Sequence, residues 1–354
     1  MTSAWLVACS SESSNGSNGG SGNASGGATS SNGGTASSNG GATASNGGAT
    51  GSSGSSSTGS VVYSPCADDK RVGTLAISFV PPTEASGDTP AVAGHSDFNG
   101  SVNDKVSPSD VWVQKSKEGD CRLMVGPKLT CSPTCDVGQV CLGNNSCTTA
   151  PAGQNVGGIT VAGFASPLSV TYLSGSSTYY AGISGAFPPV AAGTALTLTA
   201  AGATYPGFTV KANAIDPMIV GSAAIALDPT KPLTITWTKP TVLAGRVELS
   251  LDLAHHGNVA AKLKCDVEDT GTFTIPSSSL TTLAAEGVAG FPSVSITRRS
   301  VASVSVQSGC VDFTVASSVN RELTVAGLTS CQCPGSTCSD CPTGKTCGLD
   351  YVCK

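Results

Sequence analysis

The sequence has little charge, few aromatic side chains and few histidines, and each shortage excludes a class of function. Charged residues make up 12% of the 354 residues, and the net charge is −5. The chain therefore lacks the basic face of a nucleic-acid-binding protein, and we expect no nucleic-acid partner. Its three histidines leave little room for acid–base catalysis near neutral pH.

Recognisable catalytic motifs and long apolar runs are also missing. Gly94-His-Ser96-Asp-Phe98 lacks the closing glycine of a nucleophile elbow, and no P-loop, Ser-x-x-Lys or His-Glu-x-x-His sequence occurs. No run reaches the roughly 20 consecutive apolar residues of a transmembrane helix. These absences argue against an enzyme, although paired carboxylates could still serve a hydrolase. We expect no cofactor.

Cysteine, in contrast, is abundant, with 15 residues, and most of it falls into two clusters with nearly the same spacing. The clusters are Cys131-x3-Cys135-x5-Cys141-x5-Cys147 and Cys338-x2-Cys341-x5-Cys347-x5-Cys353. Segments of about twenty residues cannot form a hydrophobic core, so bridges must hold them. The spacing favours disulfides in an oxidising compartment over zinc, whose sites usually pair two C-x-x-C knuckles or add histidines.

Four cysteines allow three pairings, and the spacing does not choose among them. We favour an interleaved arrangement, which predicts the bridges Cys131–Cys141, Cys135–Cys147, Cys338–Cys347 and Cys341–Cys353. Six further cysteines are expected to be structural: Cys66, Cys121, Cys265, Cys310, Cys331 and Cys333. The two Cys-rich modules either protect the ends of a larger domain, which we favour, or form small binding units.

Period-two alternation of apolar residues predicts many short strands. It is clearest in Val247-Glu-Leu249-Ser-Leu251-Asp-Leu253. Other strands are expected at 72–80, 111–113, 121–125, 158–162, 168–173, 195–200, 207–212, 233–237, 262–267, 272–275, 294–297, 301–306, 311–315 and 322–325. One helix is expected to begin near Ser277 after Pro276, with Gly287 at its C-terminal cap.

This pattern predicts an all-β, disulfide-stapled β-sandwich, built either as one unit or as two Ig-like modules in series. The expected organisation is a short N-terminal segment (1–8), Cys9 with a disordered tether (9–60), an N-terminal β segment (61–130), a first Cys-rich module (131–150), the sandwich (151–330) and a second Cys-rich module (331–354).

The predicted tether contains only Ser, Gly, Asn, Ala and Thr from 10 to 60, apart from Glu12. Nothing in it can bury apolar surface, so we expect it to be disordered. A chain of this length and composition spans about 40 Å on average.

Leu6-Val7-Ala8-Cys9 stands just before this tether and has the order branched apolar, variable, small, Cys. It resembles the lipobox of bacterial lipoproteins. The resemblance implies cleavage before Cys9 and acylation of its thiol, and Ser10 in place of an Asp implies the outer membrane. Residues 1–8 would then be a truncated signal peptide, because they are too short and uncharged for a complete one. Either the start is placed too far downstream, which we favour, or the match is accidental. Removing Cys9 also leaves an even number of cysteines.

The order of lipobox, tether, β domain and terminal Cys-x5-Cys-x5-Cys resembles Cys-rich secreted lipoproteins of myxobacteria and related soil bacteria. That resemblance assigns no catalytic residue.

A few polar groups are candidates for metal binding. Asp266, Glu268 and Asp269 lie in a strand-to-turn corner and are weak calcium ligands, with solvated turn carboxylates as the preferred interpretation. His255-His256 follows Asp252 and lacks a nearby third ligand, so a polar turn is favoured over a metal site. Arg298-Arg299 is interpreted as a solvated strand end.

The expected function is that of a lipid-anchored protein of the bacterial outer membrane or cell surface, or otherwise a secreted one. Its role would be structural or the binding of a glycan or a surface protein. The alternative is a carbohydrate-active hydrolase. A hydrolase predicts a pocket with two carboxylates about 5–10 Å apart. A binding module predicts a shallow face with exposed aromatics such as Tyr172, Tyr179 or Tyr180.

Overall fold

The structure is a computed structural model that describes residues 63–85, 90–108, 112–126, 131–142, 145–254, 261–331 and 341–354. The expectations for the signal peptide, for Cys9 and the tether, for His255 and His256, and for Cys333 and Cys338 lie outside the described residues. Residues from Gly59 onward belong to one compact unit.

The described chain is nearly all β, which confirms the predicted fold class. Its strands are β1 Arg71–Val80, β2 His95–Val102, β3 Val113–Glu118, β4 Cys121–Val125, β5 Gln139–Cys141, β6 Cys147–Thr149, β7 Ile159–Ala162, β8 Leu168–Val170, β9 Tyr172–Leu173, β10 Thr178–Ile183, β11 Ala195–Ala200, β12 Phe208–Asn213, β13 Ala224–Leu227, β14 Leu233–Thr236, β15 Arg246–Asp252, β16 Ala261–Glu268, β17 Thr272–Ile275, β18 Ser293–Val306 and β19 Gly309–Val325, with one helix, α1 Ser277–Ala285.

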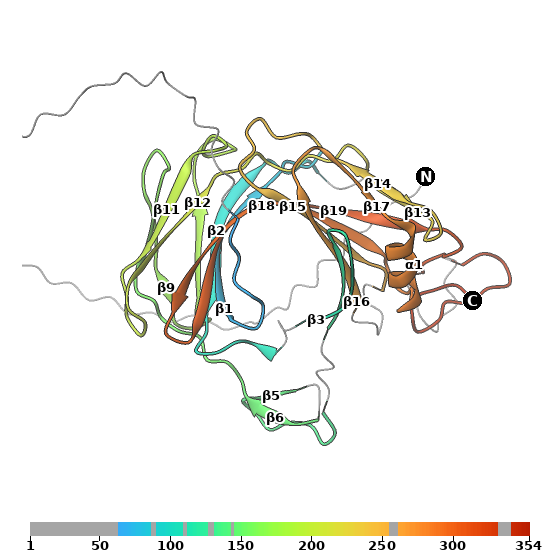
Figure 1. Ribbon diagram of the computed structural model, residues 1–354, viewed down its shortest axis with the longest axis horizontal. Helices are drawn as coiled ribbons and strands as arrows, with labels where there is room; N and C mark the ends of the chain where they lie inside the picture. Colours follow the sequence, from blue (N-terminus) through green and yellow to red (C-terminus); the bar gives the residue numbers. More distant parts are fainter. Residues whose placement is uncertain are drawn as a thin grey trace, which may run out of the picture. The chain divides into compact units, whose positions relative to one another are not determined.

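One large sheet of 11 strands organises the fold (Figure 1). Its order is β3-β4-β16-β15-β18-β19-β1-β2-β10-β9, and β13 pairs with the far end of β19. β1 runs parallel to β19 although about 240 residues separate them in sequence, with Leu75 opposite Phe313. The segment 61–130 therefore contributes strands to the same sheet as the C-terminal part of the chain.

Two hydrophobic cores lie on the same face of this sheet. In β18, Val294 and Ile296 belong to one core and Ala302 to the other. These residues are separated by even numbers of positions, so their side chains point to one face. The first core packs this face against the four-stranded sheet β12-β11-β7-β8, and the second packs it against β14, β17 and α1. Both cores take strands from early and late parts of the chain, so they are not consecutive along it.

A buried polar belt separates the two cores on that face. Arg298 lies between Ile296 and Ala302 in β18 and is 1% exposed, while Ser317 in β19 is equally buried. Ser317 Oγ accepts from the Met218 N–H at 2.9 Å and donates to the Phe79 carbonyl at 2.7 Å. The belt therefore fixes the segment 213–218, which leaves the first core after β12 and reaches the second.

The interpretation of Arg298 as a solvated strand end is wrong. Its Nε donates to Asp269 Oδ2 at 2.5 Å, and its two Nη atoms donate to the carbonyls of Pro217 at 2.9 Å and Thr238 at 2.6 Å. Asp269 Oδ1 also accepts from Trp237 Nε1 at 2.7 Å. A charge can be buried here because its partner and its hydrogen bonds are buried with it. The two strands predicted at 294–297 and 301–306 are therefore one continuous strand.

The predicted helix is confirmed. α1 begins at Ser277 after Pro276 and buries Leu280 and Leu283 in the second core, against β16 and β4. Gly287 follows the C-cap residue Glu286 with φ of 127°, a left-handed value that glycine adopts without a steric penalty.

Disulfides join distant parts of the sheet. Cys66–Cys310 links the residues before β1 to the start of β19, and Cys121–Cys265 links directly opposite residues of β4 and β16. The first Cys-rich module contains the interleaved bridges Cys131–Cys141 and Cys135–Cys147 that we expected.

The second module needs a correction. Cys341 pairs with Cys353 as expected, but Cys347 pairs with Cys331 and not with Cys338. Ser330 bridges Val352, and the Cys331 N–H donates to the Tyr351 carbonyl, which holds Cys331 beside the 347–353 hairpin. The interleaved order is kept, with a longer stretch between the first two cysteines.

Candidate binding face

The groups of close metal-type ligands found among the described residues consist mainly of bridged cysteines. They are Cys131 with Cys135 and Cys141, Cys331 with Cys341 and Cys353, and Cys66 with Cys310 and Asp312. All of these cysteines are in disulfides, so they offer no thiolate to zinc. Asp312 instead accepts hydrogen bonds from the Cys66 N–H and from Arg71 Nε.

The weak calcium candidates are occupied by other partners. Asp269 faces Arg298 in the buried pair, and Asp266 Oδ1 accepts from Arg246 Nε at 2.6 Å. Glu268 is exposed at the end of β16. The two aspartates point to opposite sides of the sheet, so the three carboxylates do not converge on one point. The weak calcium alternative is therefore not supported by their geometry. The preferred interpretation as solvated turn carboxylates is wrong for Asp269, which is 2% exposed.

Asp266 belongs to an ionic cluster around Tyr63, the first described residue. The Tyr63 hydroxyl donates to Asp266 Oδ2, and Arg299 Nη2 lies 2.9 Å from the same hydroxyl and 2.7 Å from Glu248 Oε2. The guanidinium groups of Arg246 and Arg299 lie 5.4 and 5.6 Å from the Tyr63 ring centroid. Burial raises the pKa of the Tyr63 hydroxyl, and the hydrogen bond to Asp266 adds to the rise against the opposing charge of Arg299. The cluster secures the start of the folded unit on the sheet.

The three tyrosines proposed as an aromatic binding surface are not equivalent. Tyr179 is 1% exposed, and its hydroxyl accepts from the Val156 N–H at 2.8 Å. Tyr172 is half-buried and packs against Tyr179, with ring centroids 5.3 Å apart. Tyr180 is 60% exposed. Only Tyr180 of the three is therefore available to a ligand.

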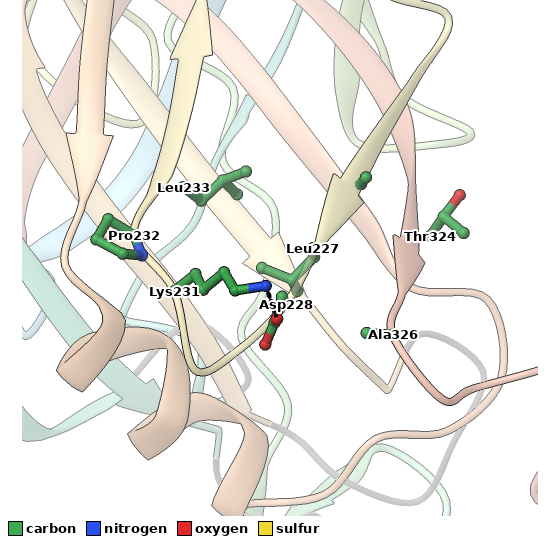
Figure 2. A pocket seen from close by; sticks show the side chains of 8 residues that line it. Leu227, Asp228, Lys231, Pro232, Leu233, Thr324 and Ala326 are labelled. Atoms are coloured by element: carbon green, nitrogen blue, oxygen red, sulfur yellow. Dashed lines mark ion pairs between the residues drawn. The ribbon is translucent and has the colours of Figure 1, made fainter.

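A small hollow lies between the ends of β13 and β19 and the start of β14 (Figure 2). Its volume is about 400 Å³, and Asp228 is the one carboxylate among its eight lining residues. Figure 2 shows Asp228 and Lys231 pointing toward each other, and their ion pair measures 2.9 Å. Hydrogen bonds from the Thr230 hydroxyl and then from Lys231 lower the pKa of Asp228 to about 2. The hollow therefore does not supply the two carboxylates that a glycosidase requires.

The most extensive polar feature is the face of the large sheet opposite the two cores, which we call the open face. In β15, alternate residues Val247, Leu249 and Leu251 are buried, and the intervening side chains are half-exposed. The register places the intervening residues of neighbouring strands side by side. Glu248 is opposite Thr297, and Thr297 is opposite Ser318, with 2.8 Å between their hydroxyls.

One cross-strand row on this face combines charge and hydroxyl groups. From β3 to β19 it reads Lys117, Arg122, Lys264, Ser250, Ser295 and Asn320, each directly opposite the next. All six side chains are exposed or half-exposed. We call the first three the basic row and the last three the neutral row.

Neither the basic row nor the Tyr63 cluster was predicted from the sequence. Lys262 and Lys264 recur at the period-two spacing of one strand face, which is a local signal. The alignment of Lys264 with Arg122 and Lys117 depends on the register of β16, β4 and β3, which no local pattern specifies.

The comparisons with known proteins do not assign this arrangement to a family. No family model matches the chain, and no curated protein matches it at a significant level. None of the helical structure in the described ranges has the length and apolarity needed to cross a membrane.

Proposed function

We propose that this protein is a lipid-anchored cell-surface protein that binds a glycan through the open face of its large sheet. The main support for the proposal is that the hydrophobic cores cover only one face of the large sheet. Both cores pack on one face, and the other presents mostly polar side chains over β16, β15, β18 and β19, interrupted at Val301 and Ala316.

The chemistry of the open face favours a sugar ligand. Hydroxyl and amide side chains such as Ser250, Ser295 and Asn320 can donate and accept hydrogen bonds, as sugar hydroxyls do. They project from paired strands, so their positions are fixed before binding and little entropy is lost when a ligand is held. A surface protein is the other partner that an extended polar face could accept.

The attachment part of the proposal rests on sequence and redox chemistry. Cys9 would carry the lipid and residues 10–60 would act as the tether. Six disulfides in the described residues support a location outside the reducing cytosol. The outer membrane is the proposed location.

The attachment is tested by growing expressing bacteria with labelled palmitate and isolating membranes. The label should appear on the wild-type chain and be lost from Cys9→Ala, which should move to the soluble fraction. Equal labelling of both chains, or none in either, contradicts lipidation at Cys9.

Glycan binding is tested with the full chain on a glycan array. Ser295→Trp places a bulky ring in the middle of the open face and should abolish binding. Thr209→Trp is the matched control, because Thr209 is exposed on β12 of the smaller sheet. Binding that survives Ser295→Trp, or an array with no glycan bound, contradicts the proposal. Capture of a surface protein in place of any glycan would identify the other partner class.

A further inference from the structure

We propose that the basic row binds carboxylates of an acidic polysaccharide, with the sugar chain continuing along the neutral row. The inference rests on the proposed glycan-binding function and names the chemical class of the ligand. It concerns Lys117, Arg122 and Lys264, which form no ion pair with any residue that the structure describes.

The strand register places the three cations side by side. Lys117 pairs directly with Arg122, and Arg122 pairs directly with Lys264. Neighbouring strands are about 4.8 Å apart, so three positive charges stand in a line of about 10 Å. Like charges directly opposite each other destabilise a sheet. The pairs Lys117–Arg122 and Arg122–Lys264 therefore lower the stability of the sheet, which uncharged residues at these positions would not do.

The same sheet contains a second pair of opposed cations, and this pair is neutralised. Arg246 and Arg299 are also directly opposite each other in β15 and β18. There the repulsion is offset, because Asp266 accepts from both guanidinium groups and Glu248 lies 2.7 Å from Arg299. Burial lowers the pKa of Arg299, but the charges of Glu248, Tyr63 and Asp266 together raise it above its ordinary value. The sheet thus neutralises one pair of opposed arginines with its own carboxylates.

The basic row receives no such carboxylate from the described residues. Asp266 and Glu248, in the adjacent row, are engaged by Arg246 and Arg299, and Asp252 lies 3.6 Å from Lys262. No ion pair within the described ranges includes Lys117, Arg122 or Lys264. An external anion would relieve the repulsion that the sheet leaves in place.

The side chains along the row select the kind of anion. The guanidinium of Arg122 presents a planar fork that fits a carboxylate with two hydrogen bonds. The neutral row continues the same line for three more strands, which suits the hydroxyls of a sugar polymer. A nucleic acid would meet only three cations on a chain of net charge −5, too few for its dense phosphates. An acidic polysaccharide offers carboxylates to the basic row and hydroxyl groups to the neutral row.

The experiment compares ligands and variants by calorimetry on the full detergent-solubilised protein. The ligands are polygalacturonate, neutral dextran and double-stranded DNA. The basic-row variant is Arg122→Gln with Lys264→Gln. The matched control is Lys70→Gln with Lys345→Gln, which removes the same charge from exposed positions outside the row.

We expect polygalacturonate to bind, with affinity falling as salt increases. The basic-row variant should lose tenfold or more in affinity, and the control less than twofold. The thermal midpoint of the basic-row variant should be equal to or above that of the wild type, because the substitutions remove repulsion. This readout separates a ligand role from a structural one.

Five outcomes overturn the inference. Three of them are equal polygalacturonate affinities for the two variants, DNA binding as tight as polygalacturonate binding, and a lowered midpoint in the basic-row variant. The fourth is binding of dextran alone, unchanged in the basic-row variant, which leaves the proposed glycan function standing. The fifth is the absence of binding to polygalacturonate, to dextran and to the glycan array, which overturns the proposed function as well.

Discussion

Arg298 and Arg299 are neighbours in β18, and the alternation of the strand sends them to opposite faces. Arg298 points to the core face and is buried there together with Asp269. Without this carboxylate, the positive charge of Arg298 would be buried and uncompensated. Arg299 points to the open face, where Glu248, Asp266 and the Tyr63 hydroxyl share its hydrogen bonds. Burial thus gives adjacent, chemically identical side chains different roles.

The buried pair makes the first prediction. Asp269→Asn removes the charge that balances Arg298, both side chains being at most 2% exposed. It should destabilise the fold by about 3–5 kcal/mol, because the arginine is left uncompensated. Guanidinium unfolding followed by Trp fluorescence measures the change. Asp69→Asn, at an exposed side chain, should cost less than about 0.5 kcal/mol. A loss of similar size in both variants contradicts the assignment of the pair.

Tyr63 makes a pH-dependent prediction. Its pKa in the folded chain is raised above the ordinary value of 10.0, so the folded state holds the phenolic proton more tightly than the unfolded state does. Its contribution to stability is therefore complete below about pH 10 and is lost as the pH rises further. The stability difference between wild type and Tyr63→Phe should shrink from pH 9 to pH 11.

Tyr180→Phe is the control for removal of a tyrosine hydroxyl, because Tyr180 is 60% exposed. It should change the free energy of unfolding at pH 9 by less than about 0.5 kcal/mol. A Tyr63→Phe difference that stays constant from pH 9 to pH 11, or grows with pH, would show that the folded pKa of Tyr63 is not raised.

Elements with a local signal could be predicted from the sequence. Alternation located β4, β11 and β17 at their observed bounds, and Pro276 and Gly287 bracketed α1. Pairings between distant elements could not be predicted. The parallel pairing of β1 with β19, and the union of two expected strands into β18, depend on partners such as Asp269 that local sequence does not reveal.

In the second Cys-rich module, one disulfide likewise could not be predicted from local sequence. Cys338 fits the repeated spacing, but Cys331 is the residue that the backbone places against the hairpin. Both modules nevertheless close their second bridge over the same separation of 12 residues. The repeated feature is the interleaved order, and the length of the first loop varies.

Peptide mapping without reduction tests this pairing. We expect a linked fragment containing Cys331 and Cys347, and a second containing Cys341 and Cys353. The Cys131–Cys141 bridge of the first module serves as the internal reference for correct oxidation. Recovery of Cys347 linked to Cys338 would restore the assignment based on spacing alone.

At the scale of the whole described fold, the two faces of the large sheet have different roles. Its core face carries both hydrophobic cores with the polar belt between them, and its open face keeps polar side chains exposed over several strands. The chain as a whole is acidic, with a net charge of −5. Three aligned cations that form no ion pair among the described residues therefore point more strongly to an anionic ligand on that face. The central claim is that this face, and the basic row in particular, receives the ligand.

Residue-resolved lysine acetylation tests that claim most directly. The full chain is treated with a trace of acetylating reagent, with and without saturating polygalacturonate, and each lysine is quantified by mass spectrometry. We expect bound polysaccharide to slow acetylation of Lys117 and Lys264 at least fivefold and to leave acetylation of exposed Lys70 and Lys345 unchanged. Equal protection of all four lysines, or protection of Lys70 and Lys345 alone, would contradict it.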